Sequence, residues 1–237
     1  MWWYASAMTA DLAVTAAIVG VAGIVGAAGY AGSAAGGAVR RRRQDRRRAL
    51  GPAPVGRGLW ARRLSFPAFM ATACCNRRTF AEVYDEPAFC EADLAWLRTL
   101  PPLRVVAIAE DWCPDVANTL PTWARLVEEL PGWELGIFAR GTVPEVMETF
   151  LWRGLDRRLP VYAFYLDERL QVWWSGRCAQ AEKALAGVLA GRAFADLPDE
   201  ERRSGSQLLQ EGYRREFRRQ SLEEVLALLR AFYHVGA

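Results

Sequence analysis

Lysine and histidine are nearly absent from this chain of 237 residues, in which Lys183 and His234 are the only examples. The cysteines are five, an odd number, and their spacing matches no metal-binding pattern: Cys74, Cys75, Cys90, Cys113 and Cys178. This usage argues against a disulfide framework, a Cys-His zinc site and a Cys-His catalytic pair. We therefore expect no bound metal and no cofactor, and we interpret the adjacent pair Cys74-Cys75 as a mobile surface pair.

Positive charge is concentrated near the N-terminus. Residues 1–69 contain ten arginines and two acidic residues, a balance of +8, whereas the remainder contains 20 basic and 25 acidic residues, a balance of −5. Because nearly every basic residue is arginine and alanine and glycine are abundant, we attribute the arginines to the codon bias of a GC-rich genome. The basic segment also lacks interleaved aromatic residues, so we expect no nucleic-acid partner.

The stretch 12–39 has no charged residue and is long enough to cross a hydrocarbon layer of ~30 Å as a helix. Its seven glycines lower the helix propensity and dilute the hydrophobicity. Two interpretations stay open. The stretch is a membrane helix, or the start codon is misassigned and residues 1–69 are a translation of DNA upstream of the true gene. If the helix spans, the arginines at 40–43 and 46–48 place the following domain in the cytoplasm, anchored to the inner membrane.

Hydrophobic periodicity divides the rest of the chain into a domain at 70–195 and a helical extension at 196–237, after an N-terminal segment at 1–69. The expected helices span 79–84, 88–100, 114–130, 143–152 and 179–190, and the expected strands span 103–109, 133–138, 160–166 and 170–174. The strand at 133–138 is apolar enough for a sheet centre, and the last two strands form a hairpin. This order predicts an α/β fold with a mixed sheet flanked by helices.

The extension at 196–237 reads as two helices broken near Gln220 and Ser221, with Ser221 capping the second. The second helix carries a wide apolar stripe. We expect it to pack back onto the domain, with a dimer interface as the alternative. The sequence leaves the oligomeric state open.

A reactive cysteine is predicted at Cys113. It follows the apolar strand at 103–109 and begins an amphipathic helix, where unpaired N–H groups and the helix dipole favour the thiolate. Asp111 and Asp115 act in the opposite direction, because negative charge disfavours a thiolate, although Asp115 also suits a helix start. The alternative is a small buried apolar residue, which is how free cysteine usually behaves.

At this motif the chain resembles the thioredoxin superfamily, in which a strand delivers Trp-Cys-x-x-Cys to a helix start. Val116 occupies the position of the second cysteine, so the motif forms no internal disulfide. The Trp-Cys-Pro-Asp motif at 112–115, Arg-Leu-Pro at 158–160 and Trp-Ser-Gly-Arg at 174–177 resemble a small bacterial family of single-cysteine thioredoxin-like proteins, from about Thr79 onward. The resemblance implies a thioredoxin-like fold.

The resemblance also implies the site residues. A cis proline at Pro160 would face the thiol and expose the backbone of Leu159 to an extended substrate. The implied substrate contacts are Trp112, Pro114, Asp115, Leu159, Pro160, Trp174 and Gly176. Ala107 stands where thioredoxins keep a buried aspartate, so a proton would need another acceptor. Cys178, in the loop entering the last helix of the fold, is a candidate distant resolving thiol.

Two functions remain open. The first is a thiol-dependent oxidoreductase in which Cys113 attacks a protein or low-molecular-weight disulfide by a monothiol route. The second is a redox-inert thioredoxin-fold module that binds a peptide or protein. The pKa of Cys113 separates them, because a nucleophile requires a value below that of a free thiol.

Overall fold

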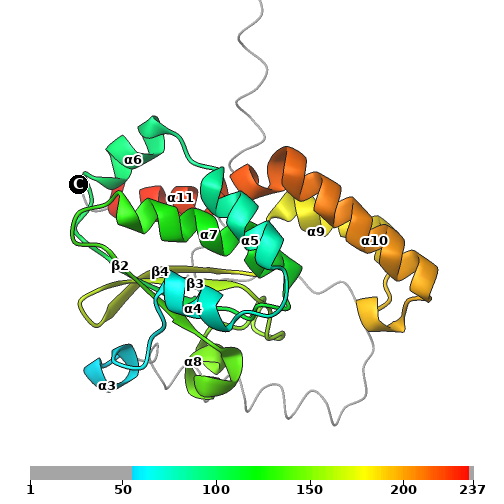
Figure 1. Ribbon diagram of the computed structural model, residues 1–237, viewed down its shortest axis with the longest axis horizontal. Coiled ribbons are helices and arrows are strands. Elements are labelled where there is room, and N and C mark those ends of the chain that lie inside the picture. The colour runs from blue at the N-terminus through cyan, green and yellow to red at the C-terminus, as the bar shows by residue number, and fades with distance from the viewer. Residues whose placement is uncertain (1–54, 235–237) are drawn as a thin grey trace, which may run out of the picture. The chain divides into compact units, whose positions relative to one another are not determined.

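The computed structural model describes residues 55–234 (Figure 1). The strands are β1 (Arg104–Ile108), β2 (Glu134–Phe138), β3 (Val161–Leu166) and β4 (Arg169–Ser175). The helices are α3 (Arg57–Trp60), α4 (Phe66–Thr72), α5 (Arg77–Asp85), α6 (Glu91–Leu97), α7 (Pro114–Glu128), α8 (Pro144–Thr149), α9 (Ala179–Leu189), α10 (Asp199–Gly212) and α11 (Arg218–His234). Two 3₁₀ turns, η1 (Arg140–Thr142) and η2 (Phe194–Asp196), and a π-helix, η3 (Tyr213–Phe217), complete them. The candidate membrane stretch 12–39 lies outside these residues, and no helix within them is long and apolar enough to cross a bilayer.

The four strands form one mixed sheet in the order β2-β1-β3-β4. β1 runs parallel to β2 and antiparallel to β3, and β3 runs antiparallel to β4 as the expected hairpin. Figure 1 shows α5, α7 and α11 above the sheet, with α8 below it. The predicted α/β fold, a mixed sheet flanked by helices, is confirmed.

Tryptophan side chains show how both faces of the β4 strand are covered. Trp173 packs against Phe150, which follows α8, with ring centroids 5.4 Å apart. The next residue, Trp174, points to the other face, because side chains alternate along a strand. There its indole stacks on Tyr162 of β3 and donates a 2.8 Å hydrogen bond to Glu224 of α11. The C-terminal helix therefore packs on the sheet itself.

The prediction that the strand at 133–138 lies at the centre of the sheet is wrong, because β2 is an edge strand. Its apolar character has another cause. The segment before α4 covers it: Leu64 exchanges two 2.9 Å backbone hydrogen bonds with Ile137, and the Trp60 ring lies over Gly136. Covering an edge in this way also protects its unpaired backbone groups from another chain.

Residues 55–69, which the sequence analysis assigned to the N-terminal segment, lie in the folded part of the chain. Val55, Trp60, Phe66 and Phe69 are buried in the same apolar core as β1 and β3. Phe66 stacks on Tyr84 of α5 with ring centroids 5.1 Å apart. The wider segment 40–69 is rich in arginine, glycine and proline, and this composition conceals the widely spaced core residues. The folded unit therefore begins before Met70.

Replacing Gly136 by alanine tests this packing. A Cβ atom at Gly136 would lie 2.6 Å from the Trp60 ring, closer than van der Waals contact allows. We expect Gly136→Ala to lower the free energy of unfolding by about 1–3 kcal/mol in urea denaturation. Gly141→Ala is the control, because a Cβ there meets nothing within 4 Å. Equal stabilities of the two variants would show that Trp60 does not cover β2.

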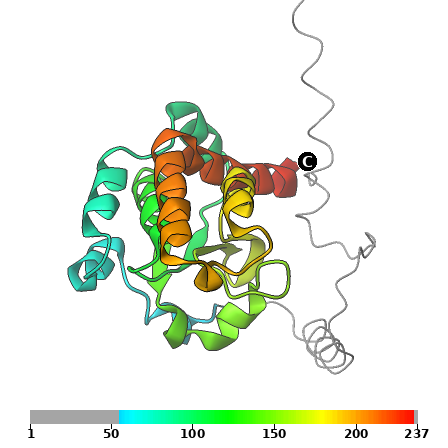
Figure 2. The ribbon, with the colours of Figure 1, turned by 90° about the vertical axis from the view of Figure 1, so that its right-hand side faces the viewer.

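The C-terminal segment is one continuous helical run from Asp199 to His234, in which α10 packs against α9 (Figure 2). The two predicted helices are present as α10 and α11, but they meet at η3 rather than at Gln220 and Ser221, and Ser221 is buried within α11 rather than capping it. The irregularity is instead the π-helix η3. Its wider turns shift the apolar face, so that Tyr213 and Phe217 join a small cluster with α9 while α11 continues onto the main core.

Candidate functional site

The sheet pairing gathers the predicted site residues at one edge. Ile108 at the end of β1 pairs with Val161 at the start of β3 and lies opposite Phe138 at the end of β2. Val161 in turn pairs with Ser175 at the end of β4. The loop holding Cys113, the segment ending at Pro160 and the loop after Ser175 therefore leave the sheet at the same edge.

Cys113 lies at the N-cap of α7, with Pro114 in the first turn. Proline suits this position, because its missing N–H would have no partner in the helix and its φ is already helical. The backbone N–H groups of Asp115 and Val116 favour the thiolate of Cys113, although the side chain accepts no cap hydrogen bond. Cys113 is nevertheless only 7% exposed, and Val116, in the place of a second cysteine, is fully buried.

The environment of Cys113 holds its thiol in the protonated form. Burial, followed by the negative charge of Asp115, raises the pKa of Cys113 to about 11. The backbone N–H groups of Asp115 and Val116 and the positive charge of Arg177 lower it by less. The predicted activation of the thiol by the helix start is therefore present but is outweighed by desolvation.

Asp115 is the centre of a buried polar network. Only 3% exposed, it accepts a 2.7 Å ion pair from Arg177 Nη2 and a 3.0 Å hydrogen bond from the hydroxyl of Tyr213. Burial raises the pKa of Asp115, and the adjacent guanidinium opposes this shift. Asp115 therefore joins three elements that are distant in sequence: the start of α7, the loop after β4 and η3.

The network continues through Glu182 of α9. Its Oε1 atom accepts from Arg158 at 2.6 Å and from Arg177 at 3.4 Å. The Arg158 guanidinium lies 3.4 Å from the centroid of the Trp152 ring, a cation–π contact. The loop that precedes Pro160 is thus held to the same network as Asp115.

Most of the predicted substrate contacts are closed to solvent. The Leu159–Pro160 peptide is cis, as the resemblance implies, but both residues are buried, as are Asp115, Trp174 and Gly176. Trp174 in particular is occupied by the contacts with Tyr162 and Glu224 described above. Sequence alone does not predict the burial of Trp174, because Glu224 of the covering helix lies 50 positions later in the chain.

Trp112 and Pro114 are the predicted contacts that a partner reaches. Trp112 is 51% exposed, and the Arg140 guanidinium lies 5.6 Å from its ring centroid. The backbone N–H of Arg140 donates a 2.8 Å hydrogen bond to Glu110, which ties η1 to the Trp112 loop. This exposed face, which we call the Trp112 face, consists of Trp112, Pro114 and Arg140.

Cys178 lies in a different environment from Cys113. It is fully buried at the N-cap of α9 and belongs to the small cluster with Tyr213 and Phe217. Its thiol has Gln220 Oε1 as a weak partner at 3.8 Å, and burial raises its pKa. Both cysteines are free thiols. Resolution of Cys113 by Cys178 stays a prediction that these contacts do not favour.

Sequence reasoning missed the partners of Asp115 and Trp174. Tyr213 lies 98 positions after Asp115, and no local pattern distinguishes it from other aromatic residues of an amphipathic helix. It also missed Asp111 as a neighbour of Cys74 and Cys75, whose backbone N–H groups donate to it. The only signal in the sequence was an acidic residue just before a helix start, where such residues are common.

Comparisons with known proteins agree with the fold. The chain resembles a protein of unknown function from Pseudomonas aeruginosa, solved by crystallography, with 17% identity and a TM-score of 0.51 over 73% of this chain and 95% of that one. It also resembles an HIV epitope-scaffold, with 16% identity and a TM-score of 0.51 over 73% of this chain and 96% of that one. No curated protein matches it. A family model described as Thioredoxin matches residues 63–191, the part that carries the sheet and Cys113, and the chain therefore belongs to the thioredoxin family.

Proposed function

We propose that this protein is a redox-inert thioredoxin-fold module that binds an extended polypeptide through the Trp112 face. The observation that carries the proposal is the contrast between two neighbours: Trp112 is half exposed, whereas Cys113 is buried. In this arrangement a partner meets the aromatic ring and not the thiol.

The surroundings of Cys113 support the absence of disulfide chemistry. Val116 replaces the second cysteine, so no dithiol exists within the motif. The buried pair of Asp115 and Arg177 fixes the first turn of α7, and Tyr213 holds it from the other side. A disulfide exchange needs a thiolate with open access to the attacked sulfur, and this first turn provides neither.

The Trp112 face has the composition of a recognition surface. Tryptophan and arginine are the residues most enriched at energetic centres of interfaces, and here Trp112 and Arg140 are neighbours. Pro114 adds an exposed apolar surface without a backbone donor. An apolar or aromatic side chain next to a carboxylate would complement this pair, with the ring packing on Trp112 and the carboxylate facing Arg140.

The test is selection of peptides from a displayed random library on the full chain, followed by titration of the selected peptides. We expect Trp112→Ala to weaken binding about tenfold, the loss of one exposed aromatic anchor. Cys113→Ser should leave the affinity unchanged. Leu155→Ala is the control for an exposed apolar residue outside the Trp112 face. Selected peptides that bind Trp112→Ala as well as the original would overturn the proposal.

A second candidate function is a monothiol oxidoreductase, favoured by one observation: Cys113 lies at the N-cap of α7, where two backbone N–H groups lower the pKa of its thiol. In this reaction the Cys113 thiolate attacks one sulfur of a mixed disulfide and forms a new S–S bond, and the leaving thiolate takes a proton from solvent. An external thiol then attacks the Cys113 mixed disulfide and restores the free cysteine. Substrates would be proteins or low-molecular-weight disulfides.

Two further assignments stay predictions from the sequence. Within the thioredoxin family, the motifs at 112–115, 158–160 and 174–177 support membership of the bacterial single-cysteine group. Attachment to the inner membrane through residues 12–39, with the folded unit on the cytoplasmic side, is proposed from their uncharged composition and the arginines that follow.

A further inference from the structure

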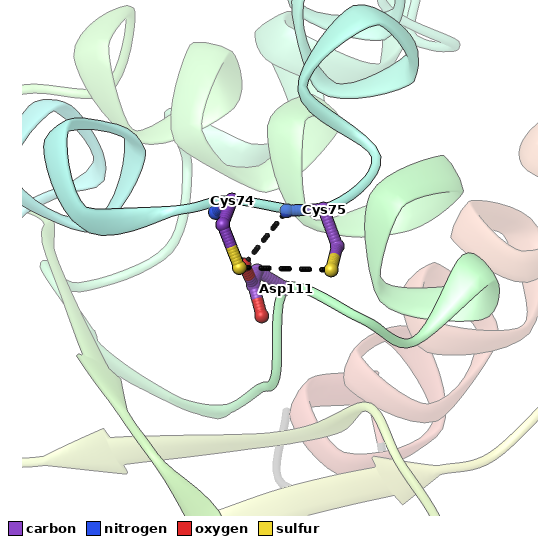
Figure 3. A group of neighbouring side chains, drawn as sticks. All are labelled: Cys74, Cys75 and Asp111. Atoms are coloured by element: carbon purple, nitrogen blue, oxygen red, sulfur yellow. Dashed lines mark hydrogen bonds between the residues drawn. The ribbon is translucent and has the colours of Figure 1, made fainter.

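Two adjacent cysteines lie outside the thioredoxin motif and beside it. Cys74 and Cys75 occupy the short connection between α4 and α5, and their sulfur atoms are 3.7 Å apart. Figure 3 shows both thiols on the same side of the connection, with the Asp111 carboxylate next to them. The two sulfur atoms and a carboxylate oxygen all lie within 4.8 Å of one another. Within residues 55–234 no other cluster of three such side chains is found.

The backbone holds this cluster in place. Asp111 Oδ2 accepts the N–H groups of Cys74 at 2.6 Å and Cys75 at 3.0 Å. The side-chain amide of Asn76 donates to the Asp111 carbonyl at 2.8 Å, and Arg77 donates to the carbonyl of Ala73 at 2.8 Å. The cysteine pair is therefore positioned by the structure and is not the mobile surface pair that the sequence suggested.

The separation of the sulfur atoms fits a tetrahedral ion. Two sulfur atoms bound to zinc at ~2.3 Å with a tetrahedral angle are about 3.8 Å apart. The observed 3.7 Å is close to this value. Because Cys74 and Cys75 are consecutive and already held by Asp111, binding requires little further ordering of the chain.

The donor set selects among metals. A purely soft ion such as Cu(I) favours thiolates alone, whereas magnesium and calcium favour oxygen. Two thiolates and one carboxylate suit zinc, which accepts sulfur, nitrogen and oxygen donors. With three protein ligands and partial exposure, the fourth position would be left to water.

We propose that Cys74, Cys75 and Asp111 form a binding site for one zinc ion. On binding, each thiol gives its proton to the buffer, and both sulfur atoms and one Asp111 oxygen bond the metal. The ion would then link the connection between α4 and α5 to the loop that carries Trp112. The site thus lies beside the Trp112 face. Zinc binding is measured without a peptide, so its result does not depend on whether the Trp112 face binds a polypeptide.

The experiment is a zinc titration of the untagged full chain in competition with a chromophoric chelator. The protein is first reduced, and the reductant is then removed under anaerobic conditions. Residues 1–54 contain neither cysteine nor histidine and so add no competing soft ligand. We expect one zinc per chain. Cys74→Ser and Cys75→Ser should each weaken zinc binding more than about 100-fold. This exceeds the ~10–100-fold loss typical of removing a residue that only hydrogen-bonds to a metal ligand. Asp111→Asn, which keeps an oxygen acceptor for the backbone, should weaken it about tenfold.

Cys90→Ser is the matched control, because Cys90 is an exposed free cysteine outside the cluster. It should bind zinc like the original chain. Cobalt(II) provides a second readout, since thiolate ligands produce a near-ultraviolet charge-transfer band that should be clearly weaker in each serine variant, which retains only one of the two thiolates. The proposal is overturned if the original chain does not compete with the chelator, if either serine variant retains its affinity, or if Asp111→Asn binds as tightly as the original.

Discussion

Replacing Arg177 by methionine is expected to lower the free energy of unfolding by about 3–5 kcal/mol. Arg177 is the ionic partner of Asp115, which is almost fully buried. Removing one member of a buried pair leaves the other charge without compensation, which costs much more than the pair itself contributes. Methionine retains the apolar stem, so most of the loss would come from the missing guanidinium charge. Urea denaturation measures it.

The double variant Arg177→Met with Asp115→Asn separates this cause from a packing defect. It removes both charges, so most of the lost stability should return. Arg78→Met is the matched control, because Arg78 pairs with Glu82 on an exposed helix face, where such pairs contribute at most about 1 kcal/mol. A loss in Arg177→Met no larger than in this control would mean that Asp115 is not held as an ion pair.

Cys113 is expected to react with iodoacetamide at neutral pH about 100-fold more slowly than an ordinary thiol. Its pKa is raised from 9.0 to about 11, and each unit lowers the thiolate fraction tenfold in this range. The rate should keep rising with pH up to about 11. Mass spectrometry of the peptide that contains Cys113 measures the rate in the unaltered chain, and the same peptide in denaturant provides the ordinary value.

This measurement also decides between the two candidate functions. A slow, alkaline profile agrees with a binding module, in which the thiol is an apolar part of the first turn of α7. A midpoint below the free-thiol value of ~8.5 would mean that Cys113 is activated, and the monothiol oxidoreductase would become the better assignment. Turnover of mixed disulfides that is lost in Cys113→Ser would then be the expected companion result.

The sequence predicted the fold best where periodicity was strong and local. The strand β1, the helix α7 and the hairpin of β3 and β4 follow directly from alternating or helical patterns, and the position of Cys113 follows from the order of the first two. The edge position of β2 was not predictable in this way. Its apolar residues are covered by Trp60 and by Leu64, whose segment resembles a linker in composition.

The resemblance to thioredoxins placed the segments of Trp112, Cys113 and Pro160 at one edge of the sheet, and the strand pairing puts them there. Their role as a site stays a prediction, and their exposure did not follow from the sequence. The burial of Cys113 depends on packing, and the fixed geometry of Asp115 depends on Tyr213, 98 positions away. Local patterns carry no information about such long-range contacts.

The separation of Asp115 and Tyr213 by 98 positions in the sequence has a consequence during protein synthesis. Chains emerge from the ribosome N-terminus first, and domains fold as units once they are complete. The sheet, α7 and Arg177 are translated before η3 and α11, so Trp174 and the cluster around Cys178 would have no cover until the final helix emerges. A nascent chain halted before Tyr213 would thus present uncovered apolar surface to chaperones until η3 and α11 are translated.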